Sequence, residues 1–266
     1  MYNILFNYNK SIILIDSSYY VFYRYFATYK WYSMQKKINT YTENEFADSF
    51  IKHMQSDIKK ISKKWKTEIN NIIFCADCPR SQIWRNDIYT DYKSTRQHQQ
   101  NFNQNIFSVF YNYIEKNNLN IINIDRLEAD DVVYLIHNKI KNTVNNIIII
   151  TNDNDYLQLI CDNTDIVNMQ LKNIKNRTKC INGNSNLYYK ALIGDKSDNI
   201  PKVSSTINKD LALQLSSYNK DSLENWLKER NLYDKFMFNL KLISFAYIPI
   251  EYNNIFEKNY SFSNIN

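Results

Sequence analysis

The stretch NIINIDRLEADDVV, residues 120–133, joins an apolar run to an apolar helical face through a group of carboxylates. Glu128, Asp130 and Asp131 place three negative charges within four positions. Like charges this close repel one another, and partial burial raises that cost further. We therefore expect either a positive group among these acids or side chains that turn outward into water.

Similar apolar runs elsewhere in the chain define the fold. Four short β-branched segments predict buried strands, at residues 11–16, 71–77, 120–125 and 146–151. Between the first two, apolar residues from Phe46 to Trp65 recur every three or four positions and predict one long amphipathic helix. Because strands alternate with helices, we expect an α/β fold with a mostly parallel central sheet flanked by helices.

Two segments depart from this alternation. Residues 80–105 are polar and basic, which predicts a mobile, arch-like segment projecting from the sheet, with an ordinary surface loop containing a helical piece as the alternative. From about residue 186 the pattern is helical without a strand signal. We therefore expect a core domain at residues 1–185 and a small helical region at residues 186–266.

Composition excludes several classes of protein. The only two glycines, Gly183 and Gly194, are too few for a dinucleotide-binding fingerprint or a phosphate-cradling loop. Cys75 and Cys78 have zinc-like spacing, but no second close pair follows them. The longest aliphatic run, residues 147–150, is too short to span a bilayer, and the first residues lack a signal segment, so we expect a cytoplasmic protein without membrane contact.

Acidic residues follow every predicted strand. At the carboxyl edge of a parallel sheet, where ligand sites gather, these side chains would converge. The candidates are Asp16, Asp77, Glu128, Asp130, Asp131, Asp153 and Asp155, with Asp195 and Asp198 added by the stretch LIGDKSDNIP. One such acid is usually a helix cap, but acids at four strand ends are hard to explain in that way.

So many carboxylates at one edge require cations. Oxygen ligands without His or Cys suit Mg²⁺ or Mn²⁺, and a pair of such ions supports attack of water on a phosphodiester. Net charge is +6, but setting the nine acids aside leaves 18 acids against 33 bases. The remaining surface, near +15, is then typical of a protein that binds a polyanion.

Five stretches in family order resemble the 5′ nucleases related to flap endonucleases. They are IILIDSSYYVFYRYFA (12–27), IIFCADCPRSQIWRNDIYTDYKSTR (72–96), LEADDVV (127–133), IIITNDNDYLQL (148–159) and ALIGDKSDNIP (191–201). WRNDIY and the ending KFMFNLKLISFAYIPIEY are most similar to the ribonuclease H of T-even bacteriophages, a subgroup that removes RNA primers and 5′ flaps.

The resemblance implies a PIN-like nuclease core, two Mg²⁺ ions (with Mn²⁺ as a substitute) and a role for each matching residue. Asp16, Asp77, Glu128 and Asp130 match the acids around the first metal, and Asp131, Asp153, Asp155, Asp195 and Asp198 match those around or near the second. Lys93 and Arg96 match the basic pair beside the scissile phosphate, and we group them with Asp130 as catalytic candidates. Arg85 matches a nucleic-acid contact at the base of the arch.

The C-terminal region departs from the family pattern. SDNIP usually leads into a glycine-rich helix–three-turn–helix hairpin, but here it continues as KVSSTINKDLALQL. We therefore expect a degenerate hairpin in which Lys196, Lys202 and Lys209 replace backbone contacts to duplex phosphates.

The resemblance also implies partners. We expect a monomer that acts on 5′-flapped or RNA-primed duplex DNA, with a single-strand-binding protein or a sliding clamp as candidate protein partners. The phage resemblance leaves open a virus-encoded protein that acts inside a host cell.

Two other functions stay open from sequence. A haloacid-dehalogenase-type phosphatase would use Asp153 and Asp155 but leave Glu128, Asp130 and Asp131 without a role. A non-catalytic nucleic-acid-binding module would keep the fold, although loss of catalysis would favour loss of uncompensated acids.

Overall fold

The computed structural model describes residues 2–35, 41–96 and 102–264. Its centre is a five-stranded sheet in the order β4-β3-β2-β5-β6, in which all neighbouring strands are parallel. The strands are β2 (Ile12–Asp16), β3 (Ile72–Ala76), β4 (Asn120–Asn123), β5 (Ile147–Ile150) and β6 (Thr164–Val167). The predicted parallel sheet is confirmed, and β6 is a fifth strand that the sequence patterns did not predict.

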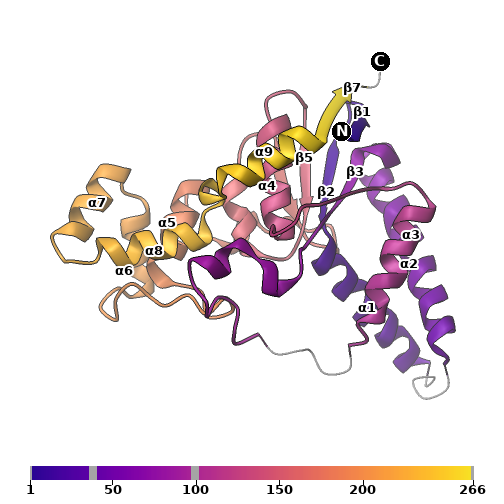
Figure 1. The fold of residues 1–266 in the computed structure, drawn as a ribbon, viewed down its shortest axis with the longest axis horizontal. Helices are drawn as coiled ribbons and strands as arrows, with labels where there is room; N and C mark the ends of the chain where they lie inside the picture. The colour runs from indigo at the N-terminus through magenta and orange to yellow at the C-terminus, as the bar shows by residue number, and fades with distance from the viewer. Residues whose placement is uncertain (1, 36–40, 97–101, 265–266) are drawn as a thin grey trace.

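Successive residues of each central strand point into opposite cores. In β2, Ile12 and Leu14 pack beneath α4 (Ala129–Ile140) and α9 (Ile250–Asn259). Ile13 and Ile15 instead pack under α1 (Ser17–Met34), α2 (Glu43–Trp65) and α3 (Asn105–Lys116), which lie together beside the sheet in Figure 1. Burial on both faces explains why the strands are continuous apolar runs rather than alternating ones.

The long predicted helix is α2. The Thr42 hydroxyl accepts a hydrogen bond from the Glu45 N–H, and the Glu45 carboxylate accepts one from the Thr42 N–H. These two bonds form a capping box at the start of the helix. The predicted apolar face is buried at Phe46, Phe50, Met54, Ile58 and Ile61.

A lobe of helices follows the sheet and lies at one end of the molecule (Figure 1). It contains α5 (Gly183–Ile193), α6 (Lys209–Ser216), α7 (Lys220–Lys228) and α8 (Tyr233–Ile243), around a third apolar core. The predicted division at residue 185 falls inside α5.

The described part of the predicted basic segment packs against the body. Residues 80–96 form short 3-10 turns, Arg80–Gln82 and Trp84–Asp87, and they bury Ile83 and Tyr92 in the core of the helical lobe. This part packs on the helical lobe rather than standing apart from it, because its apolar residues find partners there, and the arch-like character of the whole segment stays a prediction. Residues 97–101 lie outside the described chain.

The predicted helical C-terminal region is confirmed, and it ends in a strand that the sequence patterns did not predict. β7 (Tyr260–Asn264) pairs in parallel with β1 (Tyr2–Phe6) as a separate two-stranded sheet, with Ile4 opposite Phe262. The ring of Phe262 stacks on Phe6 at 5.3 Å between centroids. The chain thus returns to its beginning, as the neighbouring labels of β1 and β7 in Figure 1 show. Across the described residues, no helix is long and apolar enough to cross a membrane.

Candidate active site

The acids gather at the carboxyl edge of the sheet, near the boundary between the parallel strands β2 and β5. The strand that follows β2 in the chain, β3, lies on one side of this boundary, and the strand that follows β5, β6, lies on the other. Asp16 ends β2 and caps α1, accepting the Tyr19 N–H at 3.0 Å. Asp77 follows β3 and accepts the N–H of Ala129, the first residue of α4, at 2.8 Å. Each acid is therefore fixed at the start of a helix, where the helix dipole favours negative charge.

Two hydroxyl groups that the sequence patterns did not single out also hold Asp16. Thr151 Oγ1 and Tyr156 Oη each donate to Asp16 Oδ2 at 3.1 Å. Ser18 donates to Asp77 in the same way. These bonds fix the orientation of the carboxylates without neutralising their charge.

The acids near β2, β3 and α4 repel one another strongly. Burial, together with the charges of Asp77 and Asp153, raises the pKa of Asp16 to about 7. Burial also raises the pKa of Asp77, and burial with Asp131 and Glu128 raises that of Asp130 well above its ordinary value. Among the described residues, Asp16, Asp77 and Asp130 have no ion pair with a base. This group of acids therefore requires protons or bound cations.

Glu128 differs because two bases contact it. Lys93 Nζ contacts Glu128 Oε1, and Arg85 Nη1 donates to Oε2 at 3.0 Å. Burial alone would raise the pKa of Glu128, but Lys93 and Arg85 outweigh burial and lower the pKa to about 2. Tyr92 Oη adds a third bond at 3.0 Å. The positive group expected among the acids of residues 127–133 is thus present.

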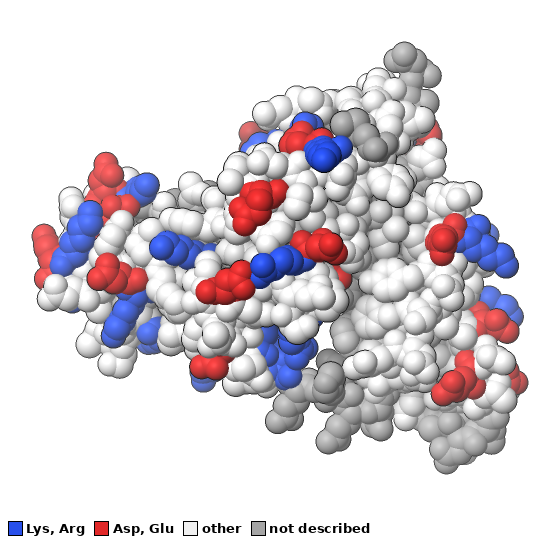
Figure 2. Space-filling view, viewed as in Figure 1, with Lys and Arg blue, Asp and Glu red and all other residues white. Residues whose placement is uncertain are grey.

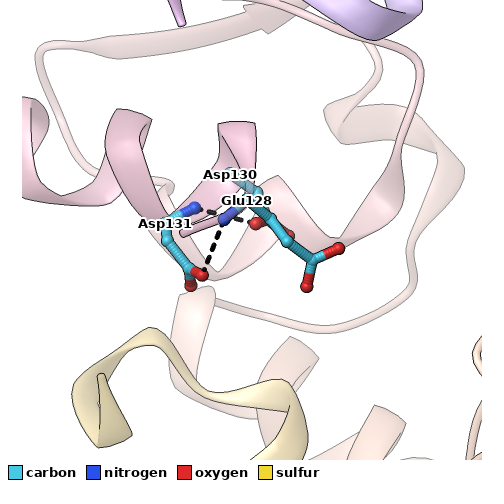
Figure 3. A group of neighbouring side chains, drawn as sticks. All are labelled: Glu128, Asp130 and Asp131. Carbon is cyan, nitrogen blue, oxygen red and sulfur yellow. Dashed lines mark hydrogen bonds between the residues drawn. The ribbon is translucent and has the colours of Figure 1, made fainter. Parts of the chain in front are cut away.

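Asp131 points away from the cavity into a buried network. Both terminal nitrogens of Arg85 donate to its carboxylate at 2.7 Å, and Trp84 Nε1 donates at 2.9 Å. Its carboxylate also accepts the Glu128 N–H, one of the two bonds drawn in Figure 3 between these neighbours at the start of α4. The same side chain therefore completes the first turn of α4.

Arg85 is only 1% exposed, and its Nε donates to the Leu242 carbonyl at 2.7 Å. This placement argues against the predicted contact of Arg85 with nucleic acid and against Asp131 as a direct metal ligand. The turn formed by WRND directs Arg85 inward, so its guanidinium meets the Asp131 carboxylate in the interior. Motif spacing alone does not reveal in which direction such a turn points.

A second group of acids lies across the cavity. Carboxylate oxygens of Asp155, Asp195 and Asp198 lie within 4.8 Å of one another. Asp153 caps the 3-10 turn Asn154–Leu159 by accepting the Asp155 N–H at 2.9 Å. Asp16, Asp77 and Asp130 form no ion pair among the described residues, but this second group does: Lys190 contacts Asp155 and Asp195, and Arg96 contacts Asp198.

The predicted basic pair lies between the two groups. Lys93 contacts Glu128 and lies 3.8 Å from Asp198. Its backbone is left-handed, with φ 56°, and its N–H donates to the Asp198 carbonyl at 3.0 Å. Such a conformation is unfavourable for a residue with a side chain and is found often at functional sites. The turn thereby directs both Lys93 and Arg96 at the acids.

Apart from Asp131 and Asp198, the acids described above line one cavity of about 730 Å³ together with Lys93 and Arg96. Its lining contains seven carboxylates, from Asp16, Asp77, Glu128, Asp130, Asp153, Asp155 and Asp195, against four bases, from Lys93, Arg96, Arg177 and Lys190. The formal excess is three negative charges. Lys190 and Arg177 were absent from the expected set, since a single base in a helix or loop gives no pattern in sequence.

The side chains present fit divalent cations. The donors are carboxylates and hydroxyls, which suit hard cations such as Mg²⁺ or Mn²⁺. Asp16, Asp77 and Asp130 are buried carboxylates with raised pKa values and form no ion pair with a base among the described residues. The chemistry of the donors and the negative net charge of the cavity therefore both favour bound divalent cations.

The three lysines predicted to contact duplex DNA lie outside this cavity. Lys196, Lys202 and Lys209 are exposed on the loop and helix that follow α5. On the face seen in Figure 2, basic and acidic side chains are intermixed over the helical lobe and form no field of one sign. The role of Lys196, Lys202 and Lys209 in binding duplex DNA stays a prediction.

Comparisons with known proteins agree with this geometry. The family model of the 5′-3′ exonuclease N-terminal resolvase-like domain matches residues 11–185. A 5′-3′ exonuclease of Mycoplasmopsis pulmonis is 30% identical over 228 residues, which cover 82% of this chain and 71% of that protein. A 5′-3′ exonuclease of Buchnera aphidicola is 29% identical over 200 residues, which cover 73% of this chain and 66% of that protein. The chain spans about two thirds of the length of these relatives.

Solved structures have the same fold. The T5 D15 protein co-crystallised with metal ions has a TM-score of 0.66 and 17% identity, covering 94% of this chain and 98% of that one. A bacteriophage T5 D15 flap endonuclease in complex with DNA and metal ions has a TM-score of 0.64 and 16% identity, with coverage of 94% and 97%. Because the family model covers residues 11–185, a phosphatase of the haloacid-dehalogenase type is set aside, and the chain belongs to the 5′-3′ exonuclease family of nucleases.

Proposed function

We propose that the protein hydrolyses phosphodiesters near the 5′ ends of flapped or RNA-primed duplex DNA, with two divalent cations, Mg²⁺ or Mn²⁺, in the cavity. The observation that carries the proposal is the convergence of acids from four strand ends with Lys93 and Arg96 in one cavity. A protein that only bound nucleic acid would gain nothing from these uncompensated charges. A 5′-flapped or RNA-primed duplex offers the polyanion and the 5′ end that the family chemistry requires.

Two sets of side chains would hold the cations. Asp16, Asp77 and Asp130 form the first set, with Glu128 beside them. Asp153, Asp155 and Asp195 form the second, with Asp198 beside them. When bound, the cations lower the pKa of the attacking water and stabilise the leaving oxygen.

The bases would bind the scissile phosphate. Lys93 and Arg96 project between the two groups of acids, and a guanidinium can hold two phosphate oxygens while charge develops on them. In the structure both bases contact carboxylates, so each base would exchange a carboxylate for a phosphate oxygen when the substrate binds. Their retention by Glu128 and Asp198 keeps them oriented before the substrate arrives.

Arg85 and Asp131 would act as positioning residues. Arg85 joins Glu128 to Asp131 and to the Leu242 carbonyl in the helical lobe. It thereby fixes Glu128 relative to α8 (Tyr233–Ile243), without touching substrate.

The test uses two substrates of matched sequence, a DNA flap and an RNA-primed duplex, each labelled at the 5′ end and incubated with Mg²⁺. We expect size-resolved products from the 5′ side, and a ladder or a single fragment would distinguish exonucleolytic from endonucleolytic cleavage. Binding of both substrates without any product would support the binding module and refute the proposal. The Asp130→Asn variant is the control for contaminating nuclease.

A further inference from the structure

Lys190 is a base inside the second group of acids. Its Nζ contacts Asp155 Oδ1 and lies 2.6 Å from Asp195 Oδ2, and its side chain is 19% exposed. In position and charge, the ammonium takes the place that a cation shared by these two carboxylates would take. No other base among the described residues forms an ion pair with Asp155 or Asp195.

The fold places Lys190 there by close packing of α5. Gly183 begins α5 against the 3-10 turn Asn154–Leu159, where an added Cβ would lie 2.4 Å from the Gln158 carbonyl oxygen. Lys190 follows seven residues later, two helical turns along the same face. The side that packs on the turn bearing Asp155 is therefore the side that carries the ammonium.

Gly194 brings Asp195 to the same point. Its φ of 71° ends α5, and an added Cβ would lie 2.5 Å from the Ile200 carbonyl oxygen. The turn closes with two backbone bonds between Asp195 and Ile200, at 2.8 and 2.9 Å. Lys190 thus meets carboxylates from two segments whose backbones are fixed independently of its own charge.

The two groups of acids consequently differ in their counter-charges. Asp16, Asp77 and Asp130 have hydroxyl and amide partners but no basic one among the described residues, whereas Asp155 and Asp195 share an ammonium. A divalent ion entering the first group meets uncompensated charge. One entering the second group must first displace Lys190, whose flexible stem and partial exposure allow the ammonium to move into solvent.

We propose that Lys190 is an internal counter-ion that occupies the second cation position until a divalent ion displaces it, so that the two positions fill in order. This inference rests on the proposed function, because it concerns the same cavity. It makes the second position the weaker one, and it makes Lys190 a positioning residue whose charge sets the affinity of that position.

The test measures Mn²⁺ binding to the full chain without nucleic acid, by calorimetry and by electron paramagnetic resonance of free Mn²⁺. Wild type should bind two ions with separated affinities. Lys190→Met should tighten the weaker class by roughly ten- to hundredfold, since an entering ion no longer has to displace an ammonium from Asp155 and Asp195, and leave the tighter class within about threefold. Lys190→Gln, which keeps a polar side chain of similar reach, should behave in the same way.

Two controls separate charge from packing. Lys190→Arg keeps the charge and should leave the weaker class near its wild-type affinity. Lys235→Met makes the same change of charge at an exposed site on α8 and should change neither class. Two ions in wild type with no tightening in either neutral variant would overturn the role of Lys190. No Mn²⁺ binding to wild type at millimolar concentration would instead overturn the proposed function.

Discussion

Replacement of Arg85 by Met tests whether this arginine supports the fold or contacts nucleic acid. The guanidinium is 1% exposed and makes bonds to Glu128 at 3.0 Å, to Asp131 at 2.7 Å and to the Leu242 carbonyl at 2.7 Å. Removing one partner of a buried ion pair leaves the other charges unpaired, which costs about 3–5 kcal/mol. We expect Arg85→Met to lose that much free energy of unfolding.

Urea unfolding of the metal-free protein, followed by circular dichroism, measures the loss. Lys139→Met is the matched control, because Lys139 forms an exposed pair with Glu257 and its loss should change stability by less than about 1 kcal/mol. In the double variant Arg85→Met with Asp131→Leu, part of the lost free energy of unfolding should be recovered, since one unpaired buried carboxylate is then absent.

The opposite result would refute this placement. If Arg85→Met lost less than about 1 kcal/mol while its affinity for duplex DNA fell and the salt dependence of binding dropped by about one phosphate contact, Arg85 would be the nucleic-acid contact that the motif predicts.

Three further predictions concern charge at the site and on the surface. Because the pKa of Asp16 is raised to about 7 in the folded chain, its contribution to stability is present near pH 4 and lost as pH rises through 7. Asp16→Asn should therefore flatten the dependence of metal-free stability on pH between 4 and 7, and an unchanged slope in thermal melts would contradict this. Lys93→Ala should lower single-turnover cleavage more than duplex affinity, and equal turnover would remove Lys93 from the site. Lys202→Ala and Lys209→Ala should each lower the salt slope of duplex binding by about one contact, with K⁺ and Na⁺ equivalent; a clear K⁺ preference would indicate a backbone hairpin instead.

The sequence predicted the central sheet because its strands are buried on both faces. Residues 147–150 show this most simply, as an uninterrupted run of isoleucine. β6 (Thr164–Val167) was missed because Thr164 and Asp165 interrupt its apolar character. β7 (Tyr260–Asn264) does carry a signal, an alternation of aromatic and serine residues, but it is short and follows a helix directly.

The acids of the site were predictable because strand ends in a parallel sheet converge. The bases that contact these acids were less predictable from sequence. Arg85 was identified as functional by its motif, yet its direction depends on a turn whose burial comes from contacts with α8 and α4, far apart in sequence. Lys190 lies in the apolar stretch LYYKALI, and only the packing of α5 brings it to Asp155.

On the proposed function, phosphodiester hydrolysis in this cavity requires bound divalent cations. The most direct measurement is single-turnover cleavage of one 5′-labelled flap duplex, as Mg²⁺ is titrated into chelator-treated protein. We expect no cleavage after chelation, recovery with Mg²⁺ or Mn²⁺, and binding without appreciable cleavage in Ca²⁺, whose looser coordination suits in-line attack poorly. Full cleavage after exhaustive chelation would contradict the proposed function.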